Sequence, residues 1–222
     1  ALPKGAWTNR LTTDGYDQPV TLQATVSTHE DTVNVDFTGT DGVSRWGINT
    51  PIIYTKAYAC YAMKCVVAPD IPNNWASLEP FTVSSPENIL NAPRPAPVSL
   101  RHVFGHMVPD LVLGALAQAL PGRILAEGAG ALWNIHMSVR PMTGQAGRRA
   151  EILMFNSGGM GARPEQDGLN ATAFPSGVMT MPIEATEHAG PVVIWRKELR
   201  PDSAGDGQYR GGLGQVIEIE PA

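Results

Sequence analysis

The sequence predicts an α+β fold with antiparallel or mixed β-sheets, two main helices and a β-rich C-terminal half. Short runs in which apolar and polar residues alternate indicate half-buried strands, and two longer runs that begin beside a proline indicate helices. The 222 residues are 43% hydrophobic and 17% charged, which suits one large domain or two small ones with a sizeable core. We expect two sub-regions, 1–122 with a hairpin and both helices, and 123–222 with further strands and glycine-rich turns.

The first strands are predicted at residues 20–26 and 32–37. Apolar residues alternate along both runs and a polar turn joins them, so we expect an antiparallel hairpin with one buried face. His29 and Asp36 are interpreted as a turn histidine and a solvent-facing carboxylate, because exposed polar residues usually have no further role. Residues 1–19 are rich in turn signals and are expected to form a lead-in outside the core.

Two helices follow in the first sub-region. A helix over 52–67 begins beside Pro51 and ends before the segment 69–98. That segment contains seven prolines, which excludes regular helix apart from short turns, so we expect a long ordered loop. The clearest helix begins at Pro109 and ends before Pro121.

Three potential metal ligands precede this second helix. His102, His106 and Asp110 fall at four-residue intervals, which on a continuous helix would place them along one face. Pro109 interrupts the turn that this geometry requires. Capping and core-edge roles are therefore preferred for the histidines, and no metal ligand is assigned.

The second sub-region is predicted to be mainly β. Strands are expected at 131–139 and 150–155, on either side of the polar turn 143–148, and together they form a second hairpin,. Further strands are predicted at residues 178–183, 192–199 and 215–219.

The composition excludes several classes of function. The formal net charge is −5 and the basic residues are not clustered, which argues against nucleic acid because phosphate binding needs concentrated positive charge. No apolar run reaches membrane-spanning length, and no signal-peptide pattern opens the chain,. Cys60 and Cys65 point apart on the predicted helix, so we expect two core thiols without a disulfide in a reducing, cytoplasmic compartment.

The candidate chemistry lies in residues 155–214, where glycines are interleaved with carboxylates and arginines. Gly158-Gly159-Met160-Gly161 directly follows a predicted strand, as a phosphate-binding loop would. It lacks the Lys-Ser/Thr ending of a P-loop, and Pro164 disfavours a following helix. Nucleotide binding is therefore not assigned to this segment.

Three carboxylates in this region are candidate catalytic groups. Glu184 and Glu187 form either a general acid/base pair or a turn that is salt-bridged to Arg163 or Arg210, since they would face opposite sides of a strand but converge in a turn. Asp202 either places a carboxylate beside backbone N–H donors or sits in a capped β-turn. No Ser/His/Asp triad is assignable, because the sequence has no nucleophile-elbow motif,.

Several motifs recur as one series along the chain. The glycine-rich region contains GGMGAR at 158–163 with DG at 167–168, PIEATE at 182–187 and DSAGDGQYRGGLG at 202–214, and upstream lie VDFTGT, PDIPN and LGALAQALP. This series resembles the hydantoinase B (N-methylhydantoinase B) family. That family includes the matching parts of ATP-dependent 5-oxoprolinases and the alpha subunits of acetone and acetophenone carboxylases.

The resemblance implies that residues 1–222 are the C-terminal region of a longer B-type subunit, and that the isolated chain is inactive. It implies ATP and a divalent metal for the full complex, but neither on this chain. The implied partners are a hydantoinase A-like subunit or domain, the remaining N-terminal part of the same subunit and a small-molecule substrate.

The implied activity is ATP-dependent opening of a cyclic amide such as a hydantoin or 5-oxoproline. A ketone carboxylase alpha subunit and a non-catalytic assembly module are the alternatives. The candidate residues within the matching motifs are Glu184, Glu187 and Asp202 for catalysis, and Arg163, Asp167 and Arg210 for substrate binding or subunit contact.

Overall fold

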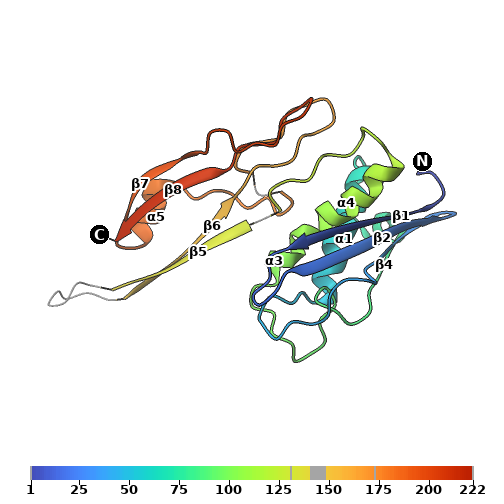
Figure 1. Cartoon of the computed structure of the whole chain (residues 1–222), viewed down its shortest axis with the longest axis horizontal. Helices are drawn as coiled ribbons and strands as arrows, with labels where there is room; N and C mark the ends of the chain where they lie inside the picture. Colours follow the sequence, from blue (N-terminus) through green and yellow to red (C-terminus); the bar gives the residue numbers. More distant parts are fainter. Residues whose placement is uncertain (1, 131, 141–148, 173, 222) are drawn as a thin grey trace. The chain divides into compact units, whose positions relative to one another are not determined.

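The computed structural model describes residues 2–130, 132–140, 149–172 and 174–221. Helices and small antiparallel or mixed sheets occur together, which confirms the predicted α+β class (Figure 1). The chain divides into two compact units, unit 1 (Ala1–Ala126) and unit 2 (Glu127–Ala222). Among the helices of the described residues, none has the length and apolar character needed to cross a membrane.

Unit 1 contains a four-stranded sheet in the order β1-β2-β3-β4. Its strands are β1 (Ala6–Thr13), β2 (Val20–His29), β3 (Thr32–Asp36) and β4 (Phe81–Ser84). The predicted hairpin is confirmed, since β2 and β3 pair in antiparallel register. Every second residue of β2 from Val20 to Val26 is buried, because successive side chains of a strand point to opposite faces.

The prediction that residues 1–19 form only a lead-in is wrong, because residues 6–13 form strand β1. This strand pairs with β2 along its whole length, and Thr8 and Thr12 form hydroxyl hydrogen bonds with threonines of β2. All of its residues are exposed or half-buried. An edge strand of this kind needs no strong apolar alternation, so the sequence pattern does not reveal it.

Two long helices, α1 (Ile52–Val67) and α4 (Met107–Ala119), pack on one face of this sheet (Figure 1). Both confirm the predicted helices, although α4 begins at Met107, ahead of Pro109, and follows the short helix α3 (His102–Gly105). The helices and the sheet enclose an apolar core. Its largest fully buried side chains include Phe37, Phe104, Leu22, Met63, Ile89, Leu90, Leu111 and Leu116.

The proline-rich segment is mostly irregular, as predicted, but it contributes helix α2 (Trp75–Leu78) and strand β4. The sequence does not indicate β4, because it is short and lies between prolines. It pairs in parallel with β3 and therefore closes a β-α-β crossover through α1. Cys60 and Cys65 are free, but Cys65 is exposed, so the prediction of a core thiol is wrong for that residue.

The described residues of unit 2 form two antiparallel pairs of strands and one helix. In chain order its elements are β5 (Leu132–Val139), β6 (Ala150–Ser157), α5 (Ile183–Ala189), β7 (Val192–Leu199) and β8 (Gln215–Pro221). A small core joins them, built from Val139, Ile152, Met154, Val192 and Ile194 and bordered by half-buried isoleucines and methionine. The strands predicted at 150–155, 192–199 and 215–219 are confirmed, and so is the first hairpin strand over 132–139.

One prediction for the second sub-region is wrong, and another concerns residues that the structure does not describe. Residues 178–182 form no strand, and α5 begins at Ile183, so the strand predicted at 178–183 is wrong. Pro182 suits the start of a helix, and the exposed Met179 has no strand beside it. Ala131 and the whole predicted polar turn, residues 143–148, lie outside the described residues.

Candidate functional site

The glycine-rich motifs meet in unit 2 as three loops, 158–163, 167–171 and 210–214, which we call the glycine-loop cluster. Main-chain hydrogen bonds join all three. Met160 N–H donates to Leu169 O at 2.9 Å, Gly212 N–H donates to Met160 O at 2.8 Å and Gly168 N–H donates to Arg210 O at 2.8 Å. The chain thus brings together segments about fifty residues apart in sequence without a regular sheet.

Glycine is required where these loops cross. A Cβ at Gly159 would overlap the carbonyl of Gly212, and a Cβ at Gly212 would overlap the carbonyl of Leu169. A Cβ at Gly168 would likewise overlap Met160 O. The clustered glycines therefore serve the close approach of backbones.

Asp167 holds two of the loops together through its side chain. Its Oδ1 accepts Arg210 N–H at 3.0 Å, and its Oδ2 lies 3.2 Å from Arg210 Nε. Arg163 Nε donates to the backbone oxygen of Asp167 at 3.0 Å. The structure therefore brings together Arg163, Asp167 and Arg210, the three residues predicted for substrate binding or subunit contact.

This trio presents hydrogen-bond donors at the surface. The side chains of Arg210 and Asp167 are 45% and 50% exposed. In the described part of the chain, the terminal Nη atoms of Arg163 and Arg210 have no hydrogen-bond partner. The Nη atoms of two guanidinium groups beside one carboxylate are suited to binding carbonyl or carboxylate oxygens.

Glu184 and Glu187 lie on helix α5 and not on a strand. Glu184 is exposed in the first turn, where a carboxylate complements the helix dipole. Glu187 Oε1 accepts Ile194 N–H at 2.8 Å and so ties α5 to β7. Among the described contacts neither glutamate meets Arg163 or Arg210, so the arginine bridge is not observed.

Asp202 lies in the turn before β8 and has a positive φ of 55°, a conformation that Asp tolerates better than most residues. The turn is closed by its neighbour, because Ser203 Oγ donates to Arg200 O at 2.8 Å and accepts Gly214 N–H at 2.9 Å. The Asp202 side chain is exposed. The three predicted catalytic carboxylates are therefore not joined by any contact among the described residues.

The histidines near α4 serve the packing of unit 1. His106 is only 3% exposed, and its Nε2 lies 3.5 Å from the hydroxyl of Tyr58, which itself stacks on Tyr54. Burial, and secondarily the charge of His102, lowers the pKa of His106 to about 4. In the residues that the structure describes, no group of three or more His, Cys, Asp or Glu side chains could hold a metal ion.

The glycine-loop cluster is poorly suited to phosphate. The N–H groups of Met160, Gly168 and Gly212 already donate to carbonyls of neighbouring loops, and no helix follows the first loop in the described residues to supply a dipole,. We therefore assign neither a nucleotide nor a metal to the described residues and derive no reaction step through either.

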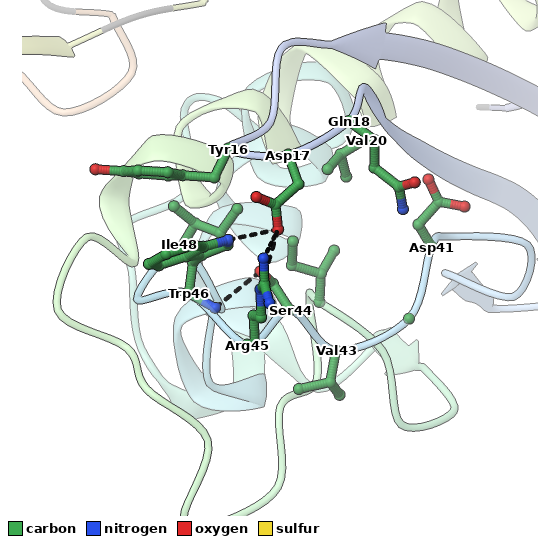
Figure 2. Close-up of a pocket in the computed structure, with 12 residues that line it drawn as sticks. Tyr16, Asp17, Gln18, Val20, Asp41, Val43, Ser44, Arg45, Trp46 and Ile48 are labelled. Atoms are coloured by element: carbon green, nitrogen blue, oxygen red, sulfur yellow. Dashed lines mark hydrogen bonds and ion pairs between the residues drawn. The ribbon is translucent and has the colours of Figure 1, made fainter.

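A pocket in unit 1, which the sequence prediction missed, has a volume of about 550 Å³ (Figure 2). It lies between the β1–β2 connection and the loop after β3, with residues 16–18 on one side and 41–46 on the other. Its remaining lining residues are the buried aliphatic side chains Val20, Ile48 and Ile89.

One side of this pocket is organised around Asp17. The Asp17 Oδ2 atom accepts Trp46 Nε1–H at 2.7 Å and Arg45 Nε–H at 3.1 Å, and Arg45 Nη2 lies 3.0 Å away. The indole of Trp46, followed by Arg45, holds the pKa of Asp17 below its usual value. Tyr16 stacks on Trp46 at 4.9 Å between ring centroids.

Asn49 fixes the loop that carries Trp46. It is fully buried; its Oδ1 accepts Ser44 N–H, and its Nδ2 donates to Ser44 O, Trp46 O and Pro97 O, all at 2.8–2.9 Å. The adjacent Arg45 and Trp46 in a glycine-flanked loop are the sequence signal that would have indicated this pocket.

The family described as Hydantoinase B/oxoprolinase matches residues 1–222. The chain is 30% identical over 90% of its length to 5-oxoprolinase 1 of Arabidopsis thaliana, and spans 15% of that protein. It is 33% identical over 60% of its length to the caprolactamase subunit beta of Pseudomonas jessenii, and spans 24% of it.

Solved structures share the fold. The crystal structure of the ATP-dependent caprolactamase from Pseudomonas jessenii matches 99% of the chain with a TM-score of 0.82 and 26% identity, and the chain covers 39% of it. The nucleotide-free acetone carboxylase matches 96% of the chain, also with a TM-score of 0.82. Its 18% identity shows the fold alone. The chain thus spans well under half the length of these relatives.

Proposed function

Because the chain belongs to the hydantoinase B/oxoprolinase family, we propose that it is part of the B-type subunit of an ATP-dependent amidohydrolase that opens a cyclic amide of the hydantoin or 5-oxoproline type. The single observation that carries this proposal is the family match over residues 1–222. In such a reaction ATP would transfer a phosphoryl group to the amide oxygen and release ADP. Water would then add to the carbonyl carbon, the ring C–N bond would break with a proton passing to the nitrogen, and hydrolysis of the acyl phosphate would release phosphate. A partner subunit of the A type supplies the ATP chemistry.

The relatives favour amide hydrolysis over ketone carboxylation. Those named 5-oxoprolinase or caprolactamase are 26% to 33% identical to the chain, whereas the acetone carboxylase structure is 18% identical. A name ending in "subunit beta" supports a partner subunit for this chain as well.

We assign the contribution of this chain to Arg163, Asp167 and Arg210. The ion pair of Asp167 fixes the arginine positions, and the guanidinium groups bind an oxygen of the substrate or a carboxylate of the partner subunit. Glu184 and Asp202, which are exposed, remain candidate catalytic carboxylates in the assembled enzyme. Glu187 also remains a candidate, although its carboxylate already accepts a backbone N–H of β7.

The proposal is tested with the complete enzyme, partner subunit included, by measuring formation of ring-opened product and substrate-dependent ATP hydrolysis. Asp167→Asn keeps an oxygen for Arg210 N–H but removes the charge beside its guanidinium, so kcat/KM should fall about tenfold or more. Glu218→Gln is the matched control, because it removes a half-exposed carboxylate from the Arg196 ion pair in the same unit.

Three outcomes contradict parts of the proposal. If Asp167→Asn, Glu218→Gln and the parent enzyme have equal activity, the glycine-loop cluster is not part of the active site. Carboxylation of acetone, without ring opening of hydantoin or 5-oxoproline, would favour the ketone carboxylase alternative. If alanine variants at Arg163, Glu184, Glu187, Asp202 and Arg210 also keep full activity and assembly, the chain is a structural module.

A further inference from the structure

We propose that the pocket of unit 1 binds a small organic cation, an alkylammonium group carried on an aliphatic body. The proposal rests on this cavity alone and does not depend on the reaction assigned to the family. The pocket is lined by residues of unit 1, whereas the glycine-loop cluster belongs to unit 2.

The shape and polarity of the pocket select the body of the ligand. Val20, Ile48 and Ile89 line it with aliphatic surface and are each less than 10% exposed. A volume of about 550 Å³ lies in the range of small-molecule sites. These three side chains are already out of water, so the apolar surface that a saturated chain or ring of several carbons would cover is that of the exposed Tyr16 and Trp46 rings,.

The charges of the pocket select the head group. Asp17 and Asp41 line it together with a single cation, Arg45, so its formal charge is −1. Asp17 already neutralises Arg45 through two guanidinium nitrogens. The carboxylate left without a counter-charge among the described lining residues is that of Asp41, which attracts a cation and repels an anion.

Asp41 is positioned to receive this head group. Figure 2 shows it across the pocket from the Asp17, Arg45 and Trp46 group. Its Oδ2 accepts Thr21 N–H at 2.7 Å, and its backbone N–H donates to Thr21 O at 2.9 Å, so the side chain is fixed. Its Oδ1 has no hydrogen-bond partner among the described residues and can accept an N–H from the ligand.

The aromatic wall adds affinity for the same chemistry. Trp46 and Tyr16 are 38% and 65% exposed, and their stacked rings border the cavity (Figure 2). Arg45 already lies 5.0 Å from the Trp46 ring centroid. Because the head group lies at Asp41 across the pocket and Arg45 already lies over the Trp46 ring, the rings contribute apolar contact to the aliphatic body of the ligand,.

The test titrates hexylammonium into the full 222-residue chain and follows binding by calorimetry and by the indole N–H signal of Trp46 in two-dimensional NMR. Hexanoate and hexanol serve as the anionic and neutral probes of the same length. We expect saturable binding of hexylammonium and at least about tenfold weaker binding of the other two. Replacing the hexyl group of the ligand by butyl should weaken binding by up to about fourfold for each methylene group removed.

The decisive variant is Asp41→Asn, which keeps an oxygen to accept Thr21 N–H and removes only the charge. It should weaken hexylammonium binding about tenfold, whereas Asp14→Asn, which changes the net charge equally outside the lining, should leave binding unchanged. The thermal unfolding of both variants reports whether the fold is kept.

Three results would overturn the proposal. These are equal affinity for hexanol and hexylammonium, equal effects of the two Asp→Asn variants, and no saturable binding of hexylammonium at millimolar concentrations. If Asp41→Asn unfolds, Val43→Asp replaces it: Val43 is an exposed lining residue, so an added carboxylate there should strengthen hexylammonium binding, and unchanged or weaker binding would contradict the site.

Discussion

The two units of this chain are stabilised in different ways. Unit 1 has a layered core in which large side chains such as Phe37 and Leu111 are fully buried between a sheet and two helices. Unit 2 buries a smaller set of residues between strand pairs and adds the glycine-loop cluster, which is joined mainly through its backbone. The stability of unit 1 therefore depends mainly on the packing of large side chains, whereas the stability of unit 2 depends largely on close contacts between backbone segments.

The largest effect is expected from Phe37→Ala in unit 1. Phe37 is fully buried at the end of β3, so its truncation leaves a cavity and should lower the free energy of unfolding by about 3–5 kcal/mol. Hydrogen exchange resolved by residue would locate the loss. Amides of β2 and α4 should lose protection while those of β7 and β8 keep it; an equal loss in β7 and β8 would show that the two units unfold together.

A second effect specific to unit 1 is a loss of stability in acid. The pKa of His106 is about 4 in the fold against 6.5 for the free side chain, chiefly because of burial. As the pH falls, His106 therefore takes up a proton in the unfolded chain at a higher pH than in the folded chain. The free energy of unfolding is highest above pH 6.5 and decreases by up to about 3 kcal/mol as the pH falls towards 4. Urea unfolding at pH 7 and pH 4.5 measures this, and His106→Asn should flatten the difference. An unchanged pH dependence in that variant would assign the acid loss to other groups.

In unit 2 the corresponding test is Gly212→Ala. The added Cβ would overlap the carbonyl of Leu169, so separation of the loops should cost about 1–3 kcal/mol. Gly205→Ala is the control in the same region, because a Cβ there meets nothing within 4 Å. Similar stability of the two variants, measured by denaturant unfolding, would mean that the loops rearrange freely and that their close approach is not required.

How much of the fold the sequence predicts depends on whether a segment buries one continuous face. The β2–β3 hairpin, α1 and α4 do so, and their periodicity identifies them. Edge strand β1 does not, and β4 is too short to show a period. Helix α5 is not predicted, because the strand expected at 178–183 reaches its first residue, although Pro182 suits the start of a helix,.

The candidate site is predictable only in part for a related reason. Arg163, Asp167 and Arg210 stand in glycine-rich motifs, and their motif membership predicts that they act together. Glu184 lies in the first turn of α5, and Glu187 joins α5 to β7 through a hydrogen bond. The motif that contains them does not predict these structural roles. The pocket combines residues 16–18 with the loop that carries Arg45 and Trp46, and Asp17 joins the two through its carboxylate. Arg45 and Trp46 stand out in the sequence, but no local pattern predicts that residues 16–18 lie beside them.

The smallest effect, and the only stabilising one, is expected at Asn156 in unit 2. This residue follows Ile152 and Met154 on the core face of β6 and is only 1% exposed. Neither its Oδ1 nor its Nδ2 has a hydrogen-bond partner among the described residues. A buried amide without partners costs free energy, so Asn156→Leu, which has similar volume, should raise the free energy of unfolding by about 1–2 kcal/mol.

The matched variant for this prediction is Asn170→Leu in the glycine-loop cluster. Asn170 Oδ1 accepts Leu213 N–H at 2.8 Å, so the same substitution there removes a hydrogen bond and should destabilise unit 2 by about 1 kcal/mol. Opposite signs in the two variants, measured by denaturant unfolding, would show that unit 2 depends on polar contacts in its loops but not in its core. A destabilised Asn156→Leu would contradict this and would indicate that the amide is satisfied by water, whose removal then carries the cost.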